Sequence, residues 1–137
     1  MAPEELLAIV AQGLEKGDFQ PLLDAISDDI VWKSAATVKG LFPFGGRYMG
    51  REGVEAWKSE FESDYAVRSI TAREVVSKGD VTWGLFWIDL FYKPTRGQVC
   101  FECAVRWRLR NERIAEHQAF IDTATVLIRE QAGLLPK

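Results

Sequence analysis

The sequence holds few groups for metal or redox chemistry, with one histidine, His117, and two cysteines among 137 residues. Cys100 and Cys103 are spaced as CFEC, inside a stretch whose apolar residues alternate with a period of two. On a strand such a pair points to opposite faces, whereas redox pairs lie at helix N-termini. We therefore expect two reduced structural cysteines, and neither a disulfide nor a bound metal. Gly45-Gly46 lacks the Lys-Ser/Thr signature of a phosphate-binding loop. We also expect no cofactor.

An excess of positive charge is also missing. The formal net charge is -3, which argues against nucleic acid or an anionic membrane surface as the main partner. No segment approaches the roughly 18 uninterrupted apolar residues of a membrane-spanning helix. The opening MAPEELLAIV lacks the basic segment and long apolar run of a secretory signal. We therefore expect no membrane association and a cytoplasmic location.

Aromatic residues, by contrast, are plentiful: the chain has eight Phe, five Trp and three Tyr. Its length suits one domain, residues 1–137, with a substantial core. So many aromatic residues predict a large aromatic-lined interior, an interface, or both.

The first half of the sequence has helical periodicity. An apolar stripe follows Pro3 and stops at Gly17, and Asp18 is a suitable N-cap for a second, shorter helix. A short strand is expected over Ile30–Ser34, then a long loop over Ala35–Gly50, rich in glycine and large apolar residues. A third helix is expected from Arg51.

From Ser69 onward the apolar period changes to two, which indicates strands joined by the turn sequences KGD, KPTRG and NE. Connections this short make neighbouring strands antiparallel. A short helix should follow from Thr123 to Glu130. The sequence therefore predicts an α+β fold. We expect a cone-shaped, curved antiparallel sheet, made of a long four-stranded meander plus the short N-terminal strand, wrapped around about three N-terminal helices. The expected meander strands are Ile70–Ser77, Val81–Tyr92, Gln98–Arg110 and Arg113–Ile121.

Three segments in this order, LEKGDFQPLLDAISDDIVW, GGRYMGREGVEAW and NERIAEHQAFID, carry a family resemblance. The chain resembles the SnoaL-like (polyketide-cyclase-like) and ketosteroid-isomerase-like branch of the nuclear transport factor 2-like superfamily. The resemblance spans nearly the whole chain. It implies a cone-shaped α+β barrel, a deep apolar pocket between sheet and helices, and a homodimer packed through the sheet.

The resemblance does not carry the catalytic residues over intact. The positions of the ketosteroid-isomerase base and oxyanion-binding Tyr are Ser34 and Val10 here, so that mechanism is not expected. SnoaL-type cyclases use an acid/base residue on the last strand, where the nearest titratable group is His117. Epoxide hydrolases resembling limonene-epoxide hydrolase use an Arg, two Asp, a Tyr and an Asn. Their positions are occupied here by Trp87, Asp89, Ala119, Trp32 and Ser34.

Two residues remain as candidate acid/base groups. His117 has suitable chemistry near neutral pH, although a lone histidine can also pack or hydrogen-bond at an interface. Asp89 lies in an almost wholly apolar strand, where a carboxylate needs a partner or a raised pKa; alternatively it faces solvent or a neighbouring Arg. Counting from the turns puts His117 opposite Arg106 and Asp89 opposite Phe101. The two would then be on the order of 16 Å apart, at opposite ends of one pocket.

The expected ligand is a small apolar molecule of polycyclic, aromatic or terpenoid-like type. An enzyme of this kind would be a cofactor-independent isomerase, cyclase, dehydratase or hydrolase that uses His117 or Asp89. The alternatives are a non-catalytic binding or accessory protein, and a structural dimer whose pocket is filled by its own side chains. We expect Tyr48 to donate a hydrogen bond to a ligand oxygen. The expected lining of the pocket is Trp32, Ser34, Tyr48, Trp57, Trp87 and Ala119.

Overall fold

The computed structural model describes residues 1–34 and 44–132. The first half contains helices and two short strands, and long strands dominate the second half. The helices are α1 (Pro3–Glu15), α2 (Gln20–Ala25), α3 (Gly50–Asp64) and α4 (Thr123–Ala132). The strands are β1 (Ile26–Ser34), β2 (Gly46–Met49), β3 (Tyr65–Lys78), β4 (Val81–Tyr92), β5 (Gly97–Arg110) and β6 (Arg113–Ile121).

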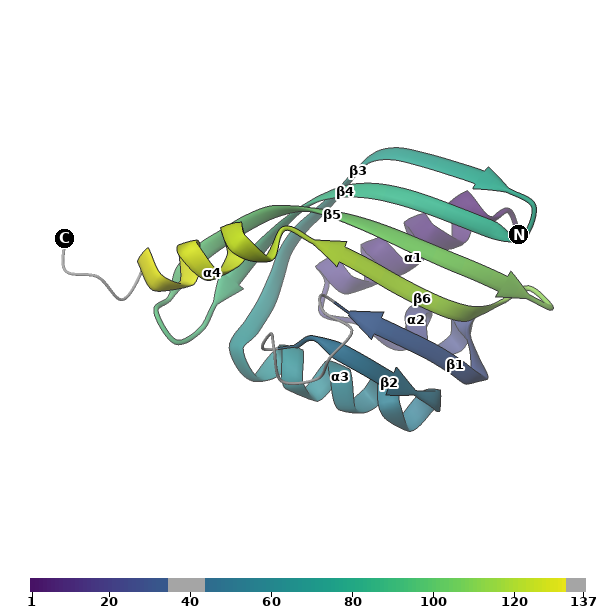
Figure 1. Cartoon of the computed structure of the whole chain (residues 1–137), viewed down its shortest axis with the longest axis horizontal. Helices are drawn as coiled ribbons and strands as arrows, with labels where there is room; N and C mark the ends of the chain where they lie inside the picture. The colour runs from purple at the N-terminus through teal and green to yellow at the C-terminus, as the bar shows by residue number, and fades with distance from the viewer. Residues whose placement is uncertain (35–43, 133–137) are drawn as a thin grey trace.

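Within these described residues, the strands form one six-stranded sheet in the order β2-β1-β6-β5-β4-β3 (Figure 1). The long strands β3 to β6 form an antiparallel meander, as the short turns between them require. β1 runs parallel to β6 and antiparallel to β2. The sheet is strongly curved and does not close, so it leaves a concave inner face that α1, α2 and α3 cover (Figure 1).

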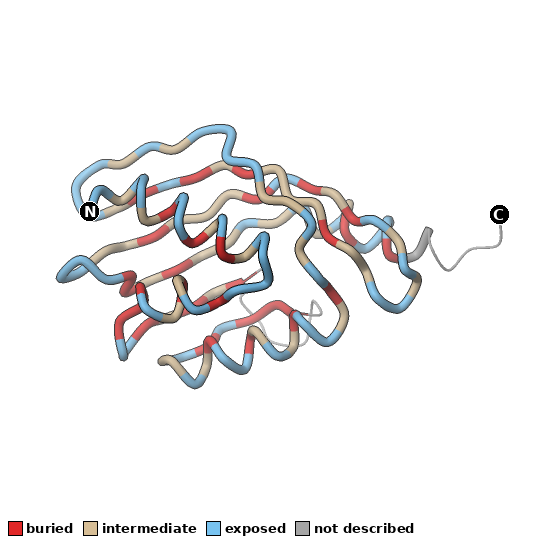
Figure 2. Tube along the Cα trace, turned by 180° about the vertical axis from the view of Figure 1, so that it is seen from behind, coloured by how far each residue is buried: buried red, intermediate tan, exposed pale blue. Residues whose placement is uncertain are grey.

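The N-terminal helices lie against this inner face. α1 packs on β3 and β4, and α3 packs on β1, so the two helices cover different parts of the concavity (Figure 1). α1 ends where the sequence predicts, because Gly17 adopts a left-handed φ of 73° that favours glycine. Buried positions alternate with less buried ones along β5, as a sheet with one covered face requires (Figure 2).

The predicted α+β fold is confirmed, with four differences. β3 begins at Tyr65, five residues before the expected start at Ile70. The N-terminal strand pairs with β6 in parallel, so the sheet is not wholly antiparallel. That strand also begins at Ile26, earlier than predicted. Of the loop expected over 35–50, residues 35–43 lie outside the described part of the chain. Its last residues are not a loop, because Gly46–Met49 form β2 and Gly50 begins α3.

The strand register differs from the sequence-based count by one residue in both relevant hairpins. His117 lies opposite Trp107 rather than Arg106, because Ala115 is an extra residue in β6 that shifts the pairing. Asp89 lies opposite Cys100 rather than Phe101, because Tyr92 pairs with Gly97 across the intervening turn. A one-residue shift exchanges the two faces of a sheet, so these differences decide which side chains face inward.

Candidate functional site

A cavity lies between the inner face of the sheet and helices α1, α2 and α3. It has two neighbouring chambers, of about 120 Å³ and about 80 Å³. The larger chamber extends toward α3, and the smaller one toward α1 and α2. Both chambers share one wall and are lined almost wholly by apolar side chains. The shared wall consists of Leu14, Trp32, Ile70, Ile88, Val105 and His117.

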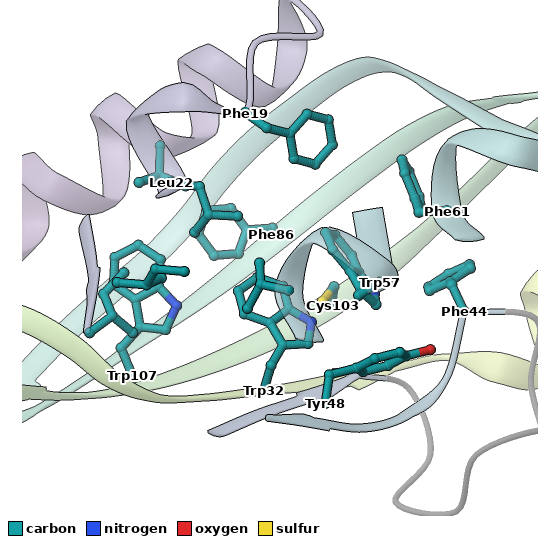
Figure 3. Packing of buried hydrophobic residues seen from close by; sticks show 14 of the residues in the cluster. Phe19, Leu22, Trp32, Phe44, Tyr48, Trp57, Phe61, Phe86, Cys103 and Trp107 are labelled. Carbon is teal, nitrogen blue, oxygen red and sulfur yellow. The ribbon is translucent and has the colours of Figure 1, made fainter. Parts of the chain in front are cut away.

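Aromatic rings form the side of the larger chamber next to α3. The ring centroids of Trp32 and Trp57 are 4.8 Å apart, and those of Trp57 and Phe61 are 5.5 Å apart. Phe44 meets Phe61 edge to face at 5.3 Å. Figure 3 shows these rings as a continuous group between α3 and the sheet. Contacts between rigid rings of this kind fix the shape of the chamber.

His117 lies in a row of inward-facing side chains that crosses the sheet. The pairing of the strands places Trp32 of β1 on one side of it and Trp107 of β5 on the other. The rings of Trp32 and His117 stack with centroids 3.5 Å apart and planes 6° apart. The indole Nε1 of Trp107 donates a hydrogen bond to Nδ1 of His117 at 2.9 Å. The imidazole is therefore held on both sides.

Burial controls the charge of His117. The residue is only 8% exposed, and loss of solvation lowers its pKa from 6.5 to about 3. The imidazole is consequently neutral near physiological pH. Its Nδ1 accepts the indole hydrogen bond, so its remaining proton belongs on Nε2. A weakly basic ring of this kind is poorly suited to act as a general base and well suited to donate a hydrogen bond.

Asp89 does not lie in the cavity, and its expected place there is wrong. It occupies the outer face of β4, next to Cys100, and Gln98 Nε2 donates a hydrogen bond to its Oδ2 at 3.0 Å. The one-residue difference in register explains the error, because the inner face at this point is formed by Leu90 and Ile88. Asp89 and His117 therefore face opposite sides of the sheet.

Two expected lining residues also lie elsewhere. Trp87 is on the outer face of β4, where the guanidinium of Arg73 stacks 5.0 Å from its ring centroid. Tyr48 belongs to the core, but its hydroxyl donates to Glu60 Oε2 at 2.6 Å and so points away from a ligand. Burial and the nearby Glu60 carboxylate raise the pKa of Tyr48. The expectations that Trp87 lines the pocket and that Tyr48 donates to a ligand are therefore wrong.

The structure brings the other expected residues together. Trp32, Ser34, Trp57, Ala119 and His117 all line the larger chamber. Ser34 is buried there with a hydroxyl that can both donate and accept a hydrogen bond. In the described part of the chain, no group of three His, Cys, Asp or Glu side chains is arranged to hold a metal ion.

Comparison with known proteins places this geometry in a family. Residues 7–117 match the sequence model of the SnoaL-like domain. The chain belongs to the SnoaL-like domain family. No curated protein matches the chain. None of the helices in residues 1–34 and 44–132 has the length and apolar character to cross a membrane.

Solved structures resemble this SnoaL-like domain over almost its whole length. An NTF2-like protein from Burkholderia pseudomallei is 17% identical, with 92% of this chain and 95% of that one covered and a TM-score of 0.81. A protein from Catenulispora acidiphila with a ketosteroid isomerase-like fold, in complex with trimethylamine, is 19% identical (99% and 96% covered, TM-score 0.78). An LEH-like epoxide hydrolase from M. tuberculosis is 15% identical (95% and 90% covered, TM-score 0.73). At these identities the likeness establishes the fold.

Trp107 and Cys103 also line the cavity of this SnoaL-like domain, although neither was expected among its lining residues. Trp107 was recognised only as one of many aromatic residues, because the extra residue Ala115 that brings it beside His117 has no sequence signal. Cys103 lines the larger chamber, and burial raises the pKa of its thiol to about 12. It therefore stays protonated and acts as a small apolar group. The alternation of β5 could have placed both residues on the inner face.

Proposed function

We propose that this SnoaL-like domain binds a small apolar molecule in the two-chambered cavity, with His117 as its polar anchor. The observation that carries the proposal is the neutral imidazole in the wall shared by two largely apolar chambers. A pocket of largely apolar lining with few placed polar groups is the usual form of a small-molecule site.

The size of the chambers narrows the ligand class. An engineered apolar cavity of about 150 Å³ accommodates benzene. The larger chamber, at about 120 Å³, and the smaller one, at about 80 Å³, therefore suit a molecule with one ring or a short branched chain. These volumes favour a one-ring ligand over a polycyclic one.

A second candidate function is cofactor-independent catalysis on such a ligand, by isomerisation, cyclisation, dehydration or hydrolysis. One observation favours it: His117 lines the apolar cavity, and a neutral imidazole that carries its proton on Nε2 can polarise a carbonyl oxygen. General acid/base catalysis by His117 is less well supported, because its lowered pKa makes the ring a weak base. Binding without chemistry remains the better supported function.

The binding proposal is tested by filling the larger chamber. Ala119 lines that chamber, so Ala119→Leu places three extra carbons where a ligand would lie. We expect acetophenone, a one-ring probe, to bind the wild-type protein, and its affinity to fall about tenfold or more in the variant. Isothermal titration calorimetry measures both affinities.

The matched control for this test is Ala66→Leu, which adds the same carbons at an exposed position of β3. It should leave acetophenone affinity unchanged. Equal losses in both variants, or no binding by the wild-type protein, would contradict a ligand site in this cavity.

We also propose that the protein forms a homodimer through the outer face of the sheet. Trp83 of β4 and Phe120 of β6 are 42% and 47% exposed, and their rings stack at 6.0 Å across β5. Val76, paired with Trp83, is 62% exposed and extends the same face. Large apolar groups gathered on one sheet face are typical of a protein interface.

A further inference from the structure

Among the residues that the structure describes, one hydrogen-bond donor, Trp107, contacts the imidazole of His117. The indole nitrogen of Trp107 carries a proton and has no lone pair to accept with, so it can only donate to Nδ1 of the imidazole. Trp32 stacks against the imidazole face at 3.5 Å and prevents the ring from tilting away from this bond. With Nδ1 occupied as an acceptor, a neutral imidazole carries its proton on Nε2.

We propose that Trp107 is a positioning residue that fixes His117 as an Nε2–H donor, and that the cavity therefore selects apolar ligands bearing a hydrogen-bond acceptor such as a carbonyl. The contacts of Trp107 and Trp32 with the imidazole support the Nε2–H tautomer. The ligand part rests on the proposed binding function.

Other polar atoms at the larger chamber favour the same ligand chemistry. The indole nitrogens of Trp32 and Trp57 are buried and have no hydrogen-bond partner in the described part of the chain. Both residues line this chamber, and Figure 3 shows their rings side by side. Each is a donor, and a buried donor without an acceptor costs free energy. The wall of this chamber therefore contains two indole donors without an acceptor, beside Ser34, whose hydroxyl can both donate and accept.

The tautomer is tested by nitrogen NMR of isotope-labelled histidine, which gives one assignable ring because His117 is the only histidine in the sequence. We expect the wild-type protein without ligand to show a bare Nδ1 and a protonated Nε2. In Trp107→Phe, which keeps an aromatic ring and removes the donor, the signals should move toward a mixture of tautomers. Trp87→Phe removes an indole donor from the outer face and should leave the spectrum unchanged.

A wild-type spectrum with the proton on Nδ1, or with a charged ring at neutral pH, overturns the inference without any need for a variant. An unchanged spectrum in folded Trp107→Phe also overturns it, because Trp107 would then not set the tautomer.

The ligand part is tested with acetophenone and α-methylstyrene, which share one shape and differ in that the first has a carbonyl oxygen. We expect acetophenone to bind the wild-type protein about fivefold to tenfold more tightly, and this preference to shrink in His117→Phe. Equal affinities in the wild-type protein overturn acceptor selection while leaving the binding function intact. If neither compound binds, the proposed function fails together with the ligand part, whereas the NMR result decides the tautomer independently.

Discussion

At the scale of residues, His117 shows how surroundings alter the chemistry of a side chain. A solvated imidazole exchanges protons near neutral pH, but in this cavity the charged form loses its hydration and gains no counter-charge. The result is a neutral donor held by two indoles. Sequence reasoning identified the residue as a candidate, yet it could not foresee this state, which depends on side chains from three strands.

Burial of His117 predicts a pH-dependent stability. The pKa is about 3 in the folded protein and 6.5 when unperturbed, so below pH 6.5 the unfolded chain takes up a proton that the folded protein excludes. Stability should therefore be complete above that pH and fall by about 2 kcal/mol by about pH 5. Urea denaturation at a series of pH values measures this loss.

The control for this measurement is His117→Phe, which keeps an aromatic ring and has no titratable group. Between pH 6.5 and pH 5, the free energy of unfolding of this variant should fall by about 2 kcal/mol less than that of the wild-type protein. Parallel pH profiles for the two proteins would show that His117 is not the responsible group.

At the scale of elements, the close approach of α2 to α1 depends on a glycine. The chain turns back after α1, and Asp18 N donates a hydrogen bond to the Gly13 carbonyl at 2.8 Å. A Cβ on Gly13 would lie 2.7 Å from the backbone oxygen of Asp18, closer than atoms pack. Because this obstacle is backbone, it cannot rotate away as a side chain can.

Gly13→Ala should therefore destabilise the protein, although alanine normally stabilises a helix by about 1 kcal/mol relative to glycine. We expect a loss of about 1–3 kcal/mol in the free energy of unfolding, measured by urea denaturation. Ser59→Ala, at an exposed position of α3, should be neutral or slightly stabilising. A stabilising effect of Gly13→Ala would show that the turn after α1 is looser than described.

The elements and the meander were largely predictable, whereas the pairing of β1 with β6 and the exact register were not. Period-two alternation located β4, β5 and β6 within a residue at each end, because one face of each strand is covered. Short turns gave the antiparallel meander. The parallel pairing of β1 with β6 joins segments distant in the sequence, and the extra residue Ala115 has no local signature. Those two features decide the composition of the cavity wall.

At the scale of the whole molecule, the sheet separates two surfaces with different proposed roles. Its inner face surrounds the ligand cavity, and its outer face presents Trp83 and Phe120. Asp89 and Trp87, expected in the pocket, lie on this outer face. A ligand site and a subunit interface can thus share strands without sharing side chains, because successive residues alternate between the faces.

The proposed homodimer predicts a mass near twice 15.5 kDa in solution. Trp83→Glu and Phe120→Glu place charges at the centre of the outer face, so each should shift the protein toward monomer. Light scattering coupled to size-exclusion chromatography measures the masses. Ile128→Glu, at a position on α4 that is 65% exposed, should leave the mass unchanged. A monomeric wild-type protein at micromolar concentration would contradict the interface.

The extra residue Ala115 in β6 has a consequence for how this scaffold tolerates insertions and deletions. On the turn side of Ala115 the strand follows one alternation, and beyond it the opposite one. Deleting that residue would remove the bulge and leave Glu116 opposite Arg108 and His117 opposite Trp107, as they are now. The strand can thus lose one residue at this point without changing which of its side chains line the cavity, whereas a deletion at a regularly paired position beyond it would reverse the faces.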